Sequence, residues 1–282
     1  MKDNQQNHAM TSNEETVLST QKSVNRKADV VLRPTGPWTE SVHSLLNHLA
    51  HVGFDAAPTA IGYAADGREM QSYIEGEFVH PGPWRDEAIV AVGQMLRRLH
   101  DATTSFEPAE DAQWQPWFLR ELGGARRVIS HGDIAPWNMV TRDGMPLALI
   151  DWEFAGPVDP MVELARVCWL FPQLHDDDVA EMVGLPPLAD RARQLRLLVD
   201  AYGVTDFERQ HLLDLILTVA VREAAEEAIE AGITPESQGP QWGLAWRIRA
   251  AAWILRHRAM LEQALRSPDG AKPSDPTLAD QL

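Results

Sequence analysis

The 282-residue chain has little cysteine, few basic residues and no long apolar run. Cys168 is its single cysteine, so no internal disulfide can form, and its place in an apolar run predicts a buried small side chain rather than a nucleophile. A membrane-spanning helix needs about 18 consecutive apolar residues, and no such stretch is present. The first dozen residues are polar and lack the apolar region of a secretory signal. We therefore expect a cytoplasmic protein.

Basic residues are outnumbered, with 25 Lys and Arg against 41 Asp and Glu and a formal net charge of -16. This balance argues against nucleic acid as the main partner, because neutralising phosphates requires clustered Lys and Arg. It is compatible with a cationic small-molecule partner, and it is equally explained by solubility. Hydrophobic residues make up 44% of the chain, which is enough for a sizeable core in one or two domains.

The order of predicted elements divides the chain into a small strand-rich part and a larger helical part. Short apolar runs before residue 33 predict strands, and Asp66-Gly67 between two apolar runs predicts a hairpin. Apolar residues at helical spacing predict helices over 39–52, 88–100, 160–171, 188–202, 206–231 and 240–266. We expect an α+β fold with a disordered tail over 1–13, an N-terminal lobe over 14–76, a helical lobe over 77–266 and a flexible tail over 267–282.

One constellation of polar residues lies between short predicted strands. In the segment from Ser130 to Asn138, Asp133 precedes Asn138 by five residues, and Asp151 ends an apolar strand thirteen residues beyond Asn138. Phosphoryl transfer needs such a set, in which one carboxylate orients the attacking hydroxyl while an amide oxygen and a second carboxylate hold Mg²⁺ on the nucleotide. The spacing therefore predicts a phosphotransferase site.

These motifs resemble those of the aminoglycoside phosphotransferase family, which has a protein-kinase-like fold. His131-Gly132-Asp133 followed by Asn138 matches the family's catalytic loop, and Ile150 to Glu153 matches its metal-binding segment. The resemblance implies two lobes, with a small antiparallel sheet in the N-terminal lobe. It implies an enzyme that uses Mg²⁺ and ATP, with GTP as an alternative, to phosphorylate a hydroxyl of a small molecule.

The resemblance also implies roles within the helical lobe. Asp133 corresponds to the catalytic base, while Asn138 and Asp151 correspond to the Mg²⁺ ligands. His131 and Glu163 correspond to residues that support the catalytic loop. Glu163 stands where the family usually has Asp.

The N-terminal lobe matches the family less closely. Arg33 ends a predicted strand where most relatives place the phosphate-binding Lys, and Glu40 is the only acidic residue in the predicted helix that normally supplies its partner. Ser72 and Ile74 would offer backbone groups to the purine. No glycine occurs between Met1 and Val31, so the Ser19–Ser23 segment would have to cover the phosphates.

The acceptor is not specified by the sequence. Glu226 and Glu227 lie near the end of the predicted 206–231 helix, where the helix dipole disfavours anions, so they are candidates for binding an aminoglycoside or another aminated compound. A solvated helix face is the alternative explanation.

Two functions of different classes fit these features. The first is an ATP- and Mg²⁺-dependent phosphotransferase with an alcohol acceptor. The second is a catalytically weak, kinase-like ligand-binding or immunity protein, which the glycine-free loop and Arg33 favour. A protein kinase fits poorly, because Asp151 is not followed by Phe-Gly and no Ala-Pro-Glu segment follows. The oligomeric state is not indicated.

Overall fold

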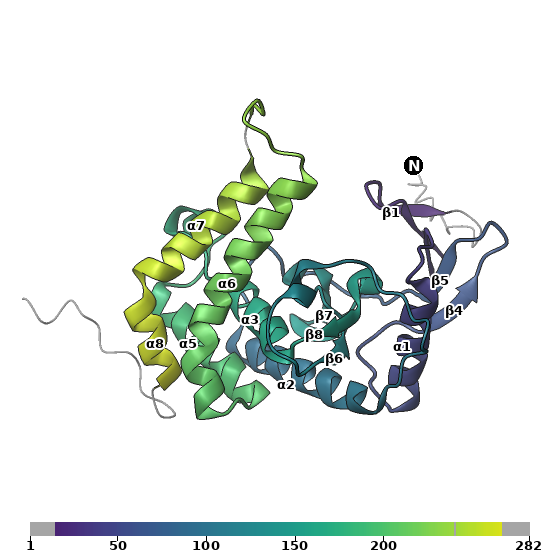
Figure 1. Cartoon of the computed structure of the whole chain (residues 1–282), viewed down its shortest axis with the longest axis horizontal. Coiled ribbons are helices and arrows are strands. Elements are labelled where there is room, and N and C mark those ends of the chain that lie inside the picture. The colour runs from purple at the N-terminus through teal and green to yellow at the C-terminus, as the bar shows by residue number, and fades with distance from the viewer. Residues whose placement is uncertain (1–14, 240, 267–282) are drawn as a thin grey trace, which may run out of the picture.

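The computed structural model describes residues 15–239 and 241–266. An antiparallel sheet forms the N-terminal part, and a mostly helical part follows (Figure 1). This arrangement confirms the predicted α+β fold. The predicted lobe boundary between residues 76 and 77 stays a prediction, and both predicted tails lie outside the described residues.

The N-terminal sheet has five strands in the order β1-β2-β3-β5-β4, each antiparallel to its neighbour. The strands are β1 (Thr16–Ser19), β2 (Val24–Lys27), β3 (Val30–Arg33), β4 (Ala60–Tyr63) and β5 (Glu69–Ser72). Arg33 of β3 lies directly opposite Glu69 of β5 in this register. Gly67 has a φ of +85° in the turn between β4 and β5, and glycine adopts this conformation without strain. The antiparallel pairing of β4 with β5 confirms the predicted hairpin.

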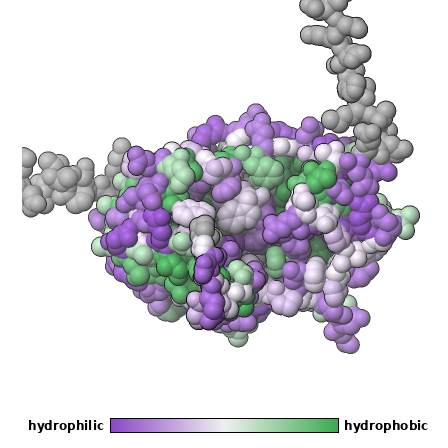
Figure 2. All heavy atoms as spheres, turned by 90° about the horizontal axis from the view of Figure 1, so that it is seen from above, coloured by the Kyte–Doolittle hydropathy of each residue, from purple (hydrophilic) through white to green (hydrophobic). Residues whose placement is uncertain are grey.

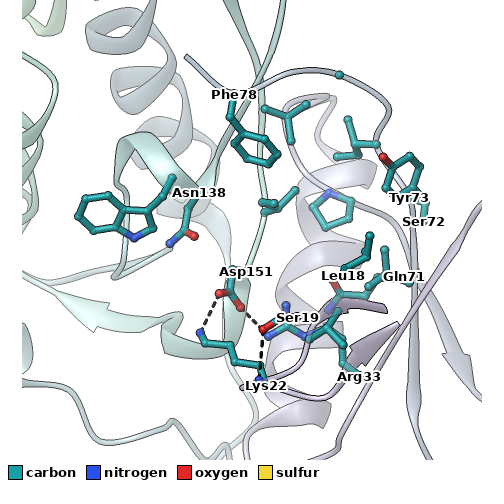
Figure 3. Close-up of a pocket in the computed structure, with 18 residues that line it drawn as sticks. Leu18, Ser19, Lys22, Arg33, Gln71, Ser72, Tyr73, Phe78, Asn138 and Asp151 are labelled. Carbon is teal, nitrogen blue, oxygen red and sulfur yellow. Dashed lines mark hydrogen bonds and ion pairs between the residues drawn. The ribbon is translucent and has the colours of Figure 1, made fainter. Parts of the chain in front are cut away.

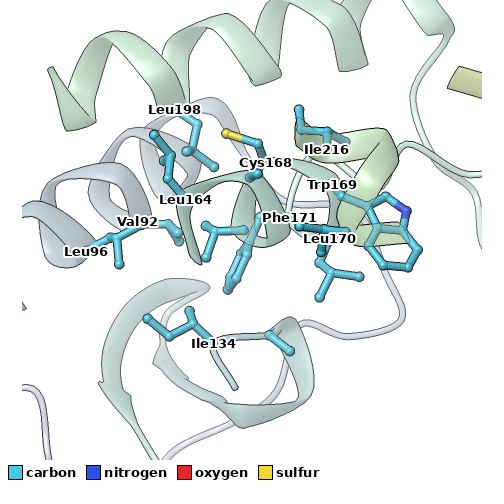
Figure 4. Close-up of a cluster of buried hydrophobic side chains, with 14 of the residues drawn as sticks. Val92, Leu96, Ile134, Leu164, Cys168, Trp169, Leu170, Phe171, Leu198 and Ile216 are labelled. Carbon is cyan, nitrogen blue, oxygen red and sulfur yellow. The ribbon is translucent and has the colours of Figure 1, made fainter. Parts of the chain in front are cut away.

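The helical part is built around one buried helix. Helix α3 (Pro160–Leu170) has ten buried residues out of eleven, and it packs against α5 and α6. Figure 4 shows Cys168 of this helix among Leu164, Leu198 and Ile216. Cys168 is fully buried and burial raises its thiol pKa, as expected for a structural cysteine.

The remaining helices extend this packing outward from the helices that flank α3, or lie against the strands. They are α1 (Thr39–His51), α2 (Asp86–Ala102), α4 (Asp177–Met182), α5 (Leu188–Tyr202), α6 (Asp206–Glu230), α7 (Trp242–Arg256) and α8 (Arg258–Arg266). The single helix predicted over 240–266 is wrong, because α7 ends before His257 and α8 begins after it. This break lets α8 pack against α5 and α6.

Two small strand pairs frame the segment that carries the phosphotransferase motifs. Strand β7 (Met139–Arg142) pairs with β8 (Met145–Leu149), and β6 (Val128–Ser130) pairs with β9 (Gly156–Val158). Strand β9 was not predicted, because a three-residue strand containing Pro gives no alternation. Short 3₁₀ turns occur at Thr103–Ser105, Phe118–Glu121, Pro136–Asn138 and Trp152–Phe154.

The described helices between residues 15 and 266 include none with both the length and the apolar composition of a membrane span.

Candidate active site

Asp133 and Asn138 are joined directly within the catalytic loop. The Nδ2 atom of Asn138 donates to the backbone oxygen of Asp133 at 2.9 Å and to its Oδ2 at 2.8 Å. The 3₁₀ turn over Pro136–Asn138 brings the amide back towards the carboxylate. Because Nδ2 is engaged by Asp133, the amide oxygen is the atom of Asn138 that can serve a metal ion.

His131 connects the two sequence motifs. Its Nδ1 accepts from the backbone N–H of Asp133 at 3.1 Å, and its Nε2 donates to the carbonyl of Ile150 at 2.9 Å. Burial lowers its pKa, which favours the neutral ring that can accept at one nitrogen and donate at the other. His131 therefore fixes the catalytic loop against the residue that precedes Asp151.

Glu163 holds the loop from helix α3. Its Oε1 accepts from the backbone N–H of Gly132 at 2.6 Å, and its Oε2 lies 2.7 Å from His100 Nε2 on α2. Gly132 has a φ of +77°, and a Cβ there would lie 2.2 Å from the carbonyl oxygen of Phe154. Only glycine fits this position without displacing the backbone.

Arg166 links Asp133 to helix α6. Its Nη2 lies 2.9 Å from Asp133 Oδ1, and its Nε donates to Glu223 Oε2 at 2.7 Å. Burial raises the pKa of Asp133, although Arg166 counteracts this. Burial would also raise the pKa of Glu223, but Arg166 and Arg247 hold it below its usual value. The raised pKa suits a general base, because it makes the carboxylate a better proton acceptor.

Asp151 is held by two cations from the N-terminal sheet. Its Oδ1 lies 2.5 Å from Arg33 Nη2, and its Oδ2 lies 2.8 Å from Lys22 Nζ (Figure 3). Both cations also contact Glu153. Burial would raise the pKa of Asp151, but Arg33 and Lys22 lower it overall. A metal ion bound at Asp151 would therefore compete with two cations from this chain.

Arg33 has a different partner from the one the sequence suggested. Its Nε lies 3.2 Å from Glu69 Oε1, which the β3–β5 register places opposite. Glu40 instead accepts a hydrogen bond from Tyr63 at 2.5 Å, so the expected pairing of Glu40 with Arg33 is wrong in this structure. Glu40 lies in the first turn of α1, whereas Glu69 comes from the strand beside Arg33. A role for Glu40 in nucleotide binding stays a prediction.

A cavity of about 390 Å³ lies between the sheet and the catalytic segment. Its lining brings together most of the predicted nucleotide and metal residues: Arg33, Ser72, Ile74, Asn138 and Asp151. Its apolar lining includes Val24, Val31, Phe78 and Val140. The volume falls within the range of small-molecule sites, and Figure 3 shows side chains of the sheet facing Asn138 and Asp151 across it.

The donor set at one end of this cavity fits magnesium. Asn138 and Asp151 offer amide and carboxylate oxygens, which Mg²⁺ prefers to nitrogen or sulfur. Within the described residues, His, Cys, Asp and Glu side chains form no group of three or more that could hold a metal by themselves. A metal here would therefore complete its shell with nucleotide phosphate oxygens and water.

The two predicted acceptor residues lie outside this cavity. Glu227 is ion-paired with Arg247 of α7 at 3.5 Å, and Glu226 lies one residue before it on α6. Their proposed role in binding an acceptor stays a prediction.

Sequence reasoning did not single out Lys22, Arg166 or Glu223. Arg166 is the only basic residue in the apolar run of α3, and a buried charge requires a counter-charge, so this signal was present. Glu223 lies in the helix predicted over 206–231, and the structure buries it. Lys22 lies in the turn of the β1–β2 hairpin and contacts Asp151, which is 129 residues further along the chain. No local sequence pattern predicts such a long-range contact.

This combination of a five-stranded sheet, a helical part and a loop carrying Asp133 and Asn138 is that of protein-kinase-like phosphotransferases. The profile of the phosphotransferase enzyme family matches residues 112–209. The trifolitoxin immunity protein of Rhizobium leguminosarum bv. trifolii is 53% identical over 247 residues, which cover 86% of this chain and 95% of that protein. The chain therefore belongs to the phosphotransferase enzyme family and is closely related to an immunity protein.

Solved structures show the same fold at low sequence identity. Amicoumacin kinase in complex with AMP-PNP, Ca²⁺ and Ami has a TM-score of 0.58 and 14% identity, covering 88% of each chain. A choline/ethanolamine kinase family protein from Mesorhizobium loti has a TM-score of 0.56 and 16% identity, covering 92% of this chain and 94% of that one. These likenesses confirm the predicted kinase-like fold. The first relative also holds a nucleotide analogue and a divalent metal.

Proposed function

We propose that this protein is an immunity protein, which protects the cell that makes it by binding a toxin next to its kinase-like cleft. The observation that carries this proposal is the 53% identity, over nearly the whole of both chains, to the trifolitoxin immunity protein. The toxin would be trifolitoxin or a compound of similar structure. Among the functions expected from the sequence, this corresponds to the ligand-binding or immunity class.

The geometry around Asp151 supports binding without rapid turnover. Arg33 and Lys22 occupy both carboxylate oxygens, and Lys22 comes from the glycine-free turn after β1. Metal binding would have to displace these cations and would lose part of its free energy in doing so. This competition favours a protein that recognises a ligand over one that turns it over rapidly.

A second candidate function is phosphoryl transfer to a hydroxyl of the toxin. It is favoured by the retained set of Asp133, Asn138 and Asp151 and by the raised pKa of Asp133. In this case Asp133 would accept the hydroxyl proton, and Asn138 and Asp151 would hold Mg²⁺, which neutralises charge on ATP phosphates. His131 and Glu163 would keep the loop in place during that step.

One experiment tests the proposal and separates the two candidates. A bacterial strain sensitive to trifolitoxin is made to express the wild-type chain or the Asp133→Asn variant, at equal soluble levels, and survival is measured. Immunity by binding predicts protection by both chains. Phosphoryl transfer predicts protection by the wild type only, because loss of the general base costs about 10²–10⁴ in rate. Absence of protection by the wild type would contradict both.

A further inference from the structure

A second cavity, of about 410 Å³, lies on the helical side of the catalytic loop. Its lining includes Trp137 of the catalytic loop, Trp242 and Trp246 of α7, and His80 and His175. Trp137 lies between Asp133 and Asn138 in the sequence and also lines the first cavity. The two cavities are therefore neighbours that share one side chain of the catalytic loop.

Flat rings dominate the walls of the second cavity. The Trp246 ring stacks on Trp169 with centroids 5.3 Å apart, and the His175 ring meets Trp246 edge-on at 5.1 Å. The His80 ring meets Trp137 edge-on at 5.4 Å. These contacts fix the orientation of the Trp137, Trp246 and two histidine rings before a ligand arrives, so little of their side-chain freedom would be lost on binding.

Trp242 is the exposed member of this set. Half of its side chain, 51%, is exposed, although large aromatic side chains gain most from burial. Trp242, Trp246 and Trp253 follow helical spacing in the sequence, which is typical either of a core stripe or of a ligand-binding face. The structure places only Trp253 fully in the core, while Trp242 and Trp246 line the cavity.

The cavity offers no counter-charge for a cation. Among the described residues that line it, none is Asp or Glu. Burial, together with Arg191 and His80, lowers the pKa of His175 to about 3, and burial also lowers that of His80, so both rings are neutral at pH 7. Arg247, the one charged residue among the described part of the lining, is already paired with Glu223 at 3.2 Å and with Glu227 at 3.5 Å. A cationic ligand group would therefore find no carboxylate among the described lining residues and would be attracted only by the faces of the tryptophan rings.

One polar atom at the cavity lacks a partner. The Nδ1 atom of His175 is buried and makes no hydrogen bond to any described residue. A buried unsatisfied nitrogen costs about 1–3 kcal/mol. Because this atom has no exposed surface, a ligand would reach it only after the His175 ring turns.

The cavity is also linked to Asp133 through ion pairs. Arg247 contacts Glu223, Glu223 contacts Arg166, and Arg166 contacts Asp133. Figure 2 looks down on the face between α6–α7 and the sheet, where residues of intermediate hydropathy lie between hydrophobic and hydrophilic patches. A molecule bound in the second cavity would thus lie beside the catalytic loop.

We propose that this cavity binds an uncharged, flat aromatic group of the molecule that the protein recognises, held between Trp242 and Trp246. The inference rests on the proposed function, because it names the chemistry of the ligand at that same site. It differs from the sequence-based prediction of a cationic ligand at Glu226 and Glu227, which becomes the competing outcome of the test.

The test measures binding of three matched probes to the purified full chain by saturation-transfer NMR titration. The probes are 2-naphthalenemethanol, the cation 2-naphthylmethylammonium, and cyclohexylmethanol. We expect the neutral aromatic probe to bind with a Kd at least about 10-fold below those of the other two. Trp242→Ala and Trp246→Leu should each raise its Kd about 3- to 10-fold, the range of aromatic pair energies.

Two controls keep the result specific. Trp114→Ala removes a tryptophan that lines a different cavity, near α1, and should leave the Kd unchanged. Trp242 is half exposed, so its variant should fold even if Trp246→Leu does not. Three results would each overturn the proposal. The first is no detectable binding of the neutral aromatic probe, and the second is equal binding of that probe to Trp242→Ala and to the wild type. The third is tighter binding of the cationic probe that is lost in a Glu226→Gln, Glu227→Gln double variant.

The failure of this inference can be told apart from failure of the immunity function. Tryptophan-dependent probe binding without protection of the cell would leave the cavity assignment standing and contradict the proposed function. Protection by the wild type together with unchanged probe binding by Trp242→Ala would contradict the cavity assignment and leave the proposed function standing.

Discussion

The guanidinium of Arg166 lies 2.9 Å from the carboxylate of Asp133, and both groups are buried. The same guanidinium pairs with Glu223 at 2.7 Å. A positive charge without a partner would be costly here, so Arg166 is stable only because two carboxylates surround it. Helix α6 thereby influences the group at the centre of the catalytic loop.

Glu223→Gln should therefore destabilise the fold. The substitution leaves Arg166 with one charged partner instead of two, and breaking a buried ion pair costs about 3–5 kcal/mol, so we expect a loss of at least about 2 kcal/mol in unfolding free energy. Urea denaturation measures it. Glu230→Gln, at an exposed position on the same helix, is the matched control and should change stability by less than about 0.5 kcal/mol. Equal stabilities of the two variants would contradict the buried network.

Gly132→Ala should be more costly than the same change at a glycine with similar backbone conformation. Gly132 has a φ of +77° and its Cβ would meet the Phe154 carbonyl at 2.2 Å, while Gly184 has a φ of +68° and no atom within 4 Å. Both variants incur about 1 kcal/mol for alanine in the left-handed region. Only Gly132→Ala also forces the loop to move, so its melting temperature should fall further and its nucleotide binding should weaken. Equal melting temperatures would remove the steric argument.

Stability should fall as the pH is lowered from 7 to 5, partly through His175. Its pKa is about 3 in the folded state and about 6.5 in the unfolded chain, so the unfolded state binds more protons below pH 6.5. At pH 5 this difference amounts to about 2 kcal/mol. His175→Gln should reduce the loss between pH 7 and pH 5 by a similar amount, measured by urea denaturation at each pH. An identical pH profile for variant and wild type would show that His175 is not held neutral.

Lys22→Ala should strengthen the thermal stabilisation that Mg²⁺-ATP provides, because it removes one cation that competes for Asp151. Asp151→Ala should abolish that stabilisation. Lys27→Ala, on strand β2, is the control and should behave as the wild type. A smaller stabilisation in Lys22→Ala than in the wild type would mean that Lys22 binds phosphate rather than competing with the metal.

The sequence predicted the parts of the fold whose signal is local. Helix α1, the hairpin at Gly67 and the cluster of Asp133, Asn138 and Asp151 are all encoded in spacing and turn residues. The breaks that depend on packing were not predictable, such as the end of α7 at His257 and strand β9, which exists because β6 lies beside it.

In the candidate active site, too, the features with a local sequence signal were predictable and those that depend on packing were not. His131 and Glu163 were expected to support the loop, and the structure shows the hydrogen bonds through which they contact it. The partner of Arg33 depends on strand register, which a single sequence does not define, so Glu40 was chosen instead of Glu69. The aromatic cavity is formed by several separate segments, within 80–81, 137, 173–183 and 242–247, and no local pattern joins them.

The central claim, that the protein protects by binding a toxin, is tested most directly by calorimetric titration of the purified chain with trifolitoxin. The account predicts saturable binding at one site per chain without nucleotide, with a Kd changed less than about twofold by Asp133→Asn and raised several-fold by Trp242→Ala, in line with aromatic contact energies. Absence of binding to the wild-type chain, both alone and with Mg²⁺-ATP, would contradict it.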